Sequence, residues 1–234
     1  MPDLRYIQNQ KKFLEYSYIA LEDNFGSRED FDSFFNSIES DEEKNLFLRS
    51  ASFYLFIVKR GEWKLNISDV QESIDDLTNT FKYIALFSLI ESLYSKDEYI
   101  DFYEYMMRHK NDLSLPIHKK LTAVLSETYE KYKSEFGTQR MALRFFESLD
   151  LEDIDLIKNR FTVRGSESPF KKLINILYKI RSKFVHQADL VVGFGRGASF
   201  GTVDKDKVLN KLSMEDLQNI FEHGLLKRFQ KEPK

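Results

Sequence analysis

The segment PFKKLINILYKIRSKFVHQADL, residues 169–190, determines the predicted fold because its apolar side chains repeat at helical spacing. Four of them follow one another at intervals of four, three and four residues: Leu173, Leu177, Ile180 and Phe184. This spacing places them on one face of an α-helix, and Pro169 stands where the first helical position is expected. We therefore predict an amphipathic helix near residues 169–187 that buries this face.

Two polar residues near the end of this helix do not share a face. At about 100° per residue, Arg181 and His186 are about 140° apart and separated by about 7.5 Å of rise. One helix cannot readily direct both side chains at a single phosphate. On geometry alone, the simpler interpretation is an exposed arginine and an exposed histidine near a helix C-terminus, where positive charge is favourable.

Apolar positions recur at three- and four-residue spacing along nearly the whole chain, which predicts an all-α fold. Serines followed three residues later by an acid or a glutamine indicate helix starts. They are Ser27, Ser40, Ser68 and Ser213. We expect helices near residues 3–23, 28–38, 41–59, 69–95, 97–110, 116–135, 139–149, 151–161, 169–187 and 214–230.

A break in the pattern at KRGEWKLN, residues 59–66, suggests two parts. Residues 1–66 are expected to form an N-terminal helical region, and residues 67–234 a larger helical bundle domain. The total of 234 residues is enough to bury a substantial core.

The composition excludes several classes of protein. There is no cysteine, so disulfides, thiolate metal sites and a cysteine nucleophile are ruled out. The N-terminus lacks an apolar signal-peptide core, and the longest apolar run, FKYIALFSLIESLY, is shorter than the ~20 residues of a membrane span. We expect a soluble cytoplasmic protein that does not contact a membrane.

The net charge of −3 conceals a local basic block at residues 158–186. This block contains one acid, Glu167, and eight cations: Lys158, Arg160, Arg164, Lys171, Lys172, Lys179, Arg181 and Lys183. Such a local excess of positive charge is typical of a surface that contacts RNA or DNA. The basic block contains both Arg181 and His186.

Other patterns are less specific. The run GFGRGASFG, residues 193–201, matches G-x-G-x-x-A, but a dinucleotide site needs a strand before it and a βαβ unit around it, so we expect a mobile loop. The four histidines lack the i, i+4 spacing that favours chelation, so no metal site is expected. Acids in DLEDIDLIKNRF, residues 150–161, fit a solvated helix start better than a catalytic cluster.

The stretch LINILYKIRSKFVHQADL, residues 173–190, resembles the R-x4-6-H motif helix of the HEPN superfamily. It has an apolar run, then Y-x-I-R, a polar residue and VH in the family's order. In particular it resembles the Apea-like branch, in which the motif lies late in a helical domain and precedes a loop and a final helix. The resemblance covers roughly residues 69–230, and only the motif helix is specific.

Many HEPN proteins are metal-independent endoribonucleases that act as homodimers, with the motif helices meeting at the two-fold axis. The resemblance therefore implies RNA as substrate, no cofactor, and a composite site to which both chains contribute. Such a site would reconcile the divergent directions of Arg181 and His186. The resemblance also implies a bacterial defence or toxin setting, and with it a regulatory partner protein.

Metal-free RNA cleavage needs a base for the 2′-hydroxyl, an acid for the leaving oxygen and a cation for the charge on phosphorus. Histidine, with an ordinary pKa of about 6.5, can serve as base or acid, and arginine can meet two phosphate oxygens. The resemblance thus assigns His186 as general base or acid and Arg181 as transition-state stabiliser. Candidate substrate contacts are Ser182, Lys183, Lys179 and Arg196.

Two positions depart from the family pattern. Ser182 stands where members often have Asn, Asp or His, which weakens orientation of the histidine. Ala188 stands where some HEPN toxins carry a tyrosine that an antitoxin modifies, so that regulation is not expected. Two alternatives remain open: a non-catalytic helical module that binds RNA or a partner protein through the basic face, and a helical scaffold in which the motif is coincidental.

Overall fold

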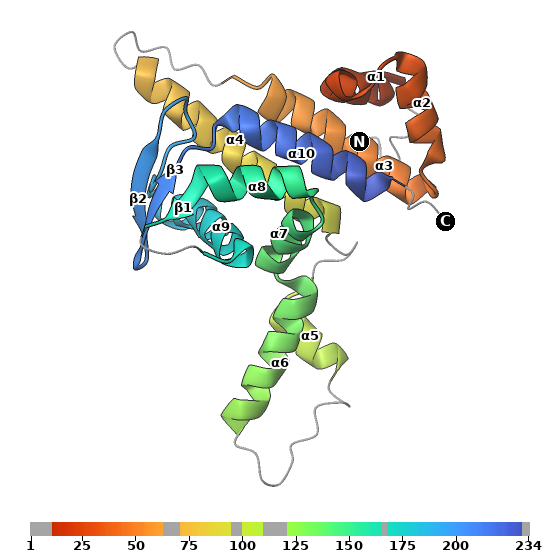
Figure 1. Cartoon of the computed structure of the whole chain (residues 1–234). Helices are drawn as coiled ribbons and strands as arrows, with labels where there is room; N and C mark the ends of the chain where they lie inside the picture. The colour runs from red at the N-terminus through yellow and green to blue at the C-terminus, as the bar shows by residue number, and fades with distance from the viewer. Residues whose placement is uncertain (1–10, 63–70, 95–99, 110–120, 165–167, 231–234) are drawn as a thin grey trace.

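The computed structural model describes residues 11–62, 71–94, 100–109, 121–164 and 168–230. These residues form helices and one small β-sheet, which confirms a predominantly helical bundle. In Figure 1, α4 and α10 lie side by side at the centre, with α1 to α3 at one end and the sheet at the other. The helices α5 and α6 extend away from this body.

The elements follow one another along the chain in a mostly helical order. The helices are α1 (Lys11–Leu21), η1 (Glu22–Asn24), α2 (Arg28–Ser37), α3 (Asp41–Phe53), η2 (Tyr54–Lys59), α4 (Gln71–Tyr94), α5 (Phe102–Arg108), α6 (Leu121–Phe136), α7 (Thr138–Glu147), α8 (Leu151–Arg160), α9 (Phe170–Gln187) and α10 (Met214–Phe229). The strands are β1 (Phe161–Val163), β2 (Ser199–Val203) and β3 (Asp206–Asn210).

Three predicted serine caps are confirmed. The hydroxyls of Ser27, Ser40 and Ser213 each accept a hydrogen bond from a backbone N–H three residues on, at 3.1 to 3.2 Å. At Ser213 the carboxylate of Asp216 accepts from the Ser213 N–H in return, which completes a capping box. The predicted cap at Ser68 lies outside the described residues.

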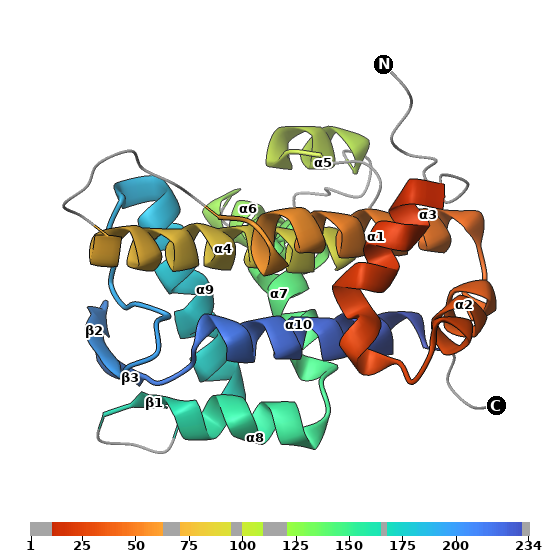
Figure 2. The same ribbon diagram turned by 90° about the horizontal axis from the view of Figure 1, so that it is seen from above.

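The N-terminal helices share one hydrophobic core with the rest of the chain. The ring of Phe47 on α3 lies 5.4 Å from that of Phe229 on α10, and Tyr54 lies 4.9 Å from Phe221. In Figure 2, α10 runs roughly parallel to α3 and α4. The boundary between residues 66 and 67 stays a prediction, but the core is continuous across it.

A buried carboxylate also joins these parts. Glu222 on α10 is 4% exposed and accepts hydrogen bonds from the Tyr54 hydroxyl at 2.6 Å and the Asn24 amide at 2.7 Å. The ammonium of Lys59 lies 3.0 Å away and supplies the opposite charge. These partners offset the desolvation of the carboxylate, which would otherwise be costly inside the core.

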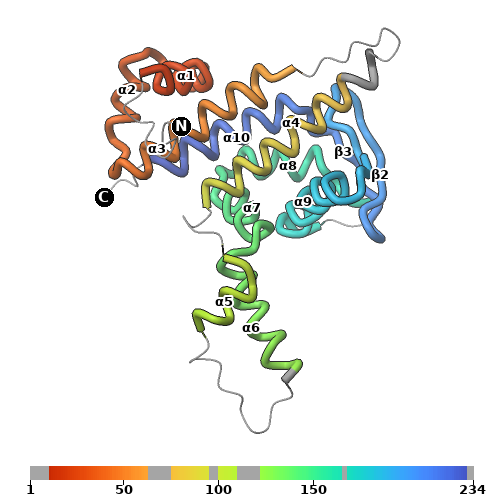
Figure 3. Tube along the Cα trace, turned by 180° about the vertical axis from the view of Figure 1, so that it is seen from behind, coloured from red at the N-terminus to blue at the C-terminus, as the bar shows by residue number. Residues whose placement is uncertain are grey.

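The sheet is antiparallel, with strand order β1-β3-β2. Strands β2 and β3 form a hairpin whose two-residue turn contains Asp204, with φ at +56°. Lysines on α9 hold this hairpin: Lys179 pairs with Asp204 and Lys172 with Asp206, both at 2.7 Å. From behind, Figure 3 shows α9 running beside β2 and β3.

The small sheet is an addition to the predicted all-α fold. Residues expected to form a mobile glycine-rich loop include the start of β2, and the helix expected at residues 151–161 ends at Arg160. The loop is also anchored. Phe194 is buried and stacks on Tyr83 at 4.1 Å, while the Asn210 amide donates to the Gly193 carbonyl.

Candidate active site on α9

The helix α9 matches the predicted amphipathic helix in position and in its buried face. Leu173, Leu177 and Ile180 are at most 3% exposed, whereas Phe184 is half-buried. Phe184 packs edge-on against Phe81 of α4, with ring centroids 5.7 Å apart. Pro169 occupies the N-cap position, one residue before the helix begins. Because its core face is packed, α9 is a rigid support for the side chains on its other faces.

The helix ends in a left-handed residue. Ala188 has φ at +53°, and its N–H donates to the Phe184 carbonyl at 2.9 Å. Glycine usually holds this position because a Cβ is unfavourable in the left-handed region. The chain therefore turns away sharply two residues after His186.

Arg181 points into the protein rather than into solvent. Its side chain is 17% exposed, and its guanidinium lies 3.6 Å from the carboxylate of Glu91 on α4. The same group lies 5.8 Å from the ring of Tyr178, within reach of a cation–π interaction. The interpretation of Arg181 as an exposed residue is therefore wrong. Its guanidinium is enclosed by the carboxylate of Glu91 and the ring of Tyr178.

The pair of Arg181 and Glu91 leaves hydrogen-bonding capacity unused. The Nε of Arg181 and the Oε1 of Glu91 are both buried without a hydrogen-bond partner. Burial raises the pKa of Glu91, and the nearby Arg181 only partly opposes this shift. Because Nε itself is buried, a ligand can reach this guanidinium only through the 17% of the side chain that stays exposed.

Glu91 was not predicted as a site residue. It is the one acid in the apolar run IALFSLIESLY, residues 84–94, and an isolated charge in a buried helix was the available signal. Sequence spacing did not connect it with Arg181, because the two lie on different helices.

His186 is exposed in the last turn of α9. Its imidazole has no hydrogen bond or ion pair to any described residue. Exposed apolar side chains surround this end of the helix: Val185, Leu190 and Phe81 are 45%, 42% and 39% exposed. Within one chain, the structure does not bring Arg181 and His186 together at a single point.

The other predicted contacts are divided between ion pairs and open surface. Lys179 pairs with Asp204, and Lys183 lies 3.9 Å from Asp189. Ser182 is half-buried, and Arg196 is exposed in the loop before β2. Both lysines therefore have local acidic partners that an RNA phosphate would have to displace.

Most of the positive charge of the basic block is paired with acidic side chains in the structure. Six of its eight cations pair with acids, and only Arg164 and Lys171 have no ion pair to a described residue. Three of these six pairs join the block to residues beyond position 200: Arg160 with Asp216, Lys172 with Asp206, and Lys179 with Asp204. The local charge count therefore overstates the field that the block presents to solvent.

The described ranges contain no group of three or more His, Asp or Glu side chains that could hold a metal ion. His223, for which no role was predicted, places Nδ1 3.1 Å from both carboxylate oxygens of the buried Asp153. This contact ties α10 to α8.

No protein-family model, curated protein or solved structure matches this chain. The HEPN resemblance therefore rests on the motif helix and its apolar frame alone. Among the described helices, none has the length and apolar character needed to cross a bilayer.

Proposed function

We propose that this chain is a metal-independent endoribonuclease of the HEPN type whose active site is completed by a second copy. The observation that carries the proposal is the arrangement on α9. The guanidinium of Arg181 lies against Glu91 while 17% of its side chain stays exposed, and His186, which has no ion pair to a described residue, lies about one and a half turns later on the same helix.

A second chain supplies what one chain lacks. Arg181 and His186 diverge on α9, so a phosphate held by Arg181 of one chain needs His186 from the other. The exposed side chains of Val185, Leu190 and Phe81 offer apolar surface that such a contact would cover. Cytoplasmic RNA in a defence or toxin setting is the proposed context.

The proposed reaction follows from the two side chains. His186 takes the proton of the 2′-hydroxyl, and the 2′-oxygen then bonds to phosphorus. The bond from phosphorus to the 5′-oxygen breaks as the protonated imidazole of a His186 side chain gives a proton to that oxygen. Arg181 stabilises the charge on the phosphoryl oxygens. The products are a 2′,3′-cyclic phosphate and a 5′-hydroxyl.

The test is incubation of RNA with the full chain in EDTA, followed by analysis of the fragment ends. We expect 2′,3′-cyclic phosphate ends, and a rate per chain that rises with protein concentration until the dimer is saturated. A rate per chain that is independent of concentration would contradict the composite site. Gln187→Ala, which changes an exposed neighbour of His186, is the matched control and should cleave normally.

One observation favours a second candidate, RNA binding without cleavage. The guanidinium of Arg181 is already engaged by Glu91, which leaves it less available to stabilise a transition state. Under this alternative the chain binds RNA in a salt-sensitive manner and releases no product in the same assay.

A further inference from the structure

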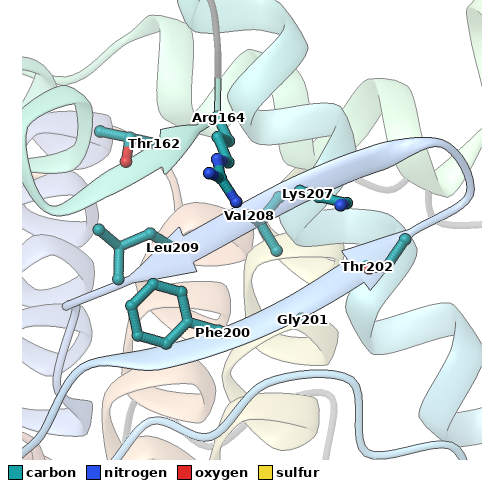
Figure 4. A pocket seen from close by; sticks show the side chains of 8 residues that line it. All are labelled: Thr162, Arg164, Phe200, Gly201, Thr202, Lys207, Val208 and Leu209. Carbon is teal, nitrogen blue, oxygen red and sulfur yellow. The ribbon is translucent and has the colours of Figure 1, made fainter.

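The outer face of the β-sheet, on the side away from α9, contains an aromatic side chain and two cations around a hollow. The hollow has a volume of about 510 Å³, and the residues of the outer face that line it are Thr162, Arg164, Phe200, Thr202, Lys207 and Leu209. Figure 4 shows side chains from all three strands arranged over this face. It lies on a different element from the proposed cleavage site.

The strand register places these side chains in two rows. Thr162, Leu209 and Phe200 are cross-strand neighbours in one row. In the next row Lys207 lies opposite Thr202, and the Arg164 N–H donates to the Lys207 carbonyl at 2.8 Å, which extends the ladder. Phe200 and Lys207 are therefore diagonal neighbours, about 7–8 Å apart.

Phe200 breaks the pattern expected of such a face. The inner positions Phe161, Val203 and Val208 are buried, so the outer positions should be polar. Phe200 is instead 76% exposed on an edge strand. Hydration of an exposed aromatic ring is unfavourable, and an exposed apolar edge strand favours association with other chains. The exposure of Phe200 is explained if a planar ligand covers its ring.

The two cations on this face differ from most of the basic block. Arg164 and Lys207 are exposed and have no ion pair to a described residue. The nearby hairpin acids Asp204 and Asp206 are engaged by lysines of α9, so they do not neutralise the outer face. The face thus combines an open aromatic ring with available positive charge.

We propose that this outer sheet face binds single-stranded RNA, with a base stacked on Phe200 and the flanking phosphates held by Arg164 and Lys207. Every base presents a π-face, so the ring gives affinity with little sequence preference, and the cations follow the backbone. The hydroxyls of Thr162 and Thr202 border the same hollow. This deepens the proposed function, on which the choice of RNA as the nucleic acid rests, by giving its substrate a holding surface apart from α9.

The proposal is tested by fluorescence anisotropy with a short, labelled, single-stranded oligonucleotide whose 2′-hydroxyls are replaced by fluorine. This probe cannot be cleaved by 2′-oxygen attack, so binding is measured whether or not the chain is a nuclease. Phe200→Ala should weaken binding about tenfold or more. Tyr103→Ala, which removes a 68% exposed ring on α5, is the matched control and should bind as the wild type does.

The cations are tested by the salt dependence of the same binding. Arg164→Ala and Lys207→Ala should each reduce the slope of log Kd against log salt by about 0.7, the value for one phosphate contact on a single strand. Lys131→Ala, an exposed lysine on α6, should leave the slope unchanged. An abasic oligonucleotide should bind wild type and Phe200→Ala equally, because it offers phosphates but no base.

Equal affinity of wild type and Phe200→Ala for the base-bearing probe would overturn the proposal, as would unchanged salt slopes in both cation variants. Cleavage of natural RNA in EDTA is scored separately. Binding that depends on Phe200 without cleavage would uphold this face and remove the nuclease. Cleavage of RNA together with binding that is unchanged by Phe200→Ala would support the nuclease and contradict the proposed sheet face.

Discussion

The guanidinium of Arg181 on α9 lies 3.6 Å from the carboxylate of Glu91 on α4, and both side chains are largely withdrawn from solvent. This contact fixes the arginine in the protein before any ligand arrives. It also makes Arg181 a structural residue as well as a proposed catalytic one, so the two roles need separate measurements.

Arg181→Ala should lower the free energy of unfolding by about 1–3 kcal/mol, because it leaves the carboxylate of Glu91 buried without its counter-charge. Urea denaturation measures the loss. Lys183→Ala on the same helix is the control. Its pair with Asp189 is longer and its partner is exposed, so a change within about 0.5 kcal/mol is expected. Equal losses in the two variants would show that the contact with Glu91 contributes nothing.

Glu91 should make stability depend on pH. Burial raises the pKa of Glu91 in the folded chain, so the folded state holds its proton at pH values where the unfolded state has lost it. The unfolding free energy should therefore fall, relative to Glu91→Gln, as pH rises from about 4.3 through the raised folded value. Urea unfolding of both proteins across this range measures the difference. A wild type that gains stability relative to Glu91→Gln would mean that attraction to Arg181 outweighs burial.

Ala188→Gly should stabilise the chain by up to about 1 kcal/mol, because Ala188 holds a left-handed conformation at the end of α9. Thermal and urea unfolding report the change. Gln187→Gly, one residue earlier in helical conformation, should instead destabilise. If both glycine variants lose stability, the left-handed end of α9 is not a source of strain.

Gly224→Ala should destabilise by about 1–3 kcal/mol, because a Cβ at this position on α10 would lie 2.4 Å from the ring of Phe145 on α7. Gly197→Ala is the matched control, since a Cβ there meets no atom within 4 Å. Denaturation midpoints distinguish the two variants. A neutral Gly224→Ala would mean that α10 and α7 can separate without cost.

The helices were predictable from sequence because their evidence is local. The face of α9 follows from the spacing of Leu173, Leu177 and Ile180, and the starts of α2, α3 and α10 follow from serine caps. The sheet was missed for the opposite reason. Its strands are three to five residues long, and β1 is separated from β3 by the whole of α9. Short strands of this kind form through packing and pairing rather than intrinsic preference.

The candidate site was only half predictable. Spacing on α9 shows that Arg181 and His186 diverge, but not what each one faces. The inward turn of Arg181 depends on Glu91, which is 90 positions earlier in the sequence. In the same way, the basic block was predicted as exposed charge, whereas Asp204, Asp206 and Asp216 come from later segments and pair with it.

The most direct test of the central claim is the cleavage of RNA in EDTA by the wild type and by His186→Ala. His186 is exposed and has no hydrogen bond or ion pair to a described residue, so its substitution should leave folding intact, which circular dichroism can verify. We predict fragments with 2′,3′-cyclic phosphate ends from the wild type, and a rate lower by about a hundredfold or more in His186→Ala. Identical fragments at an unchanged rate from His186→Ala would contradict the account.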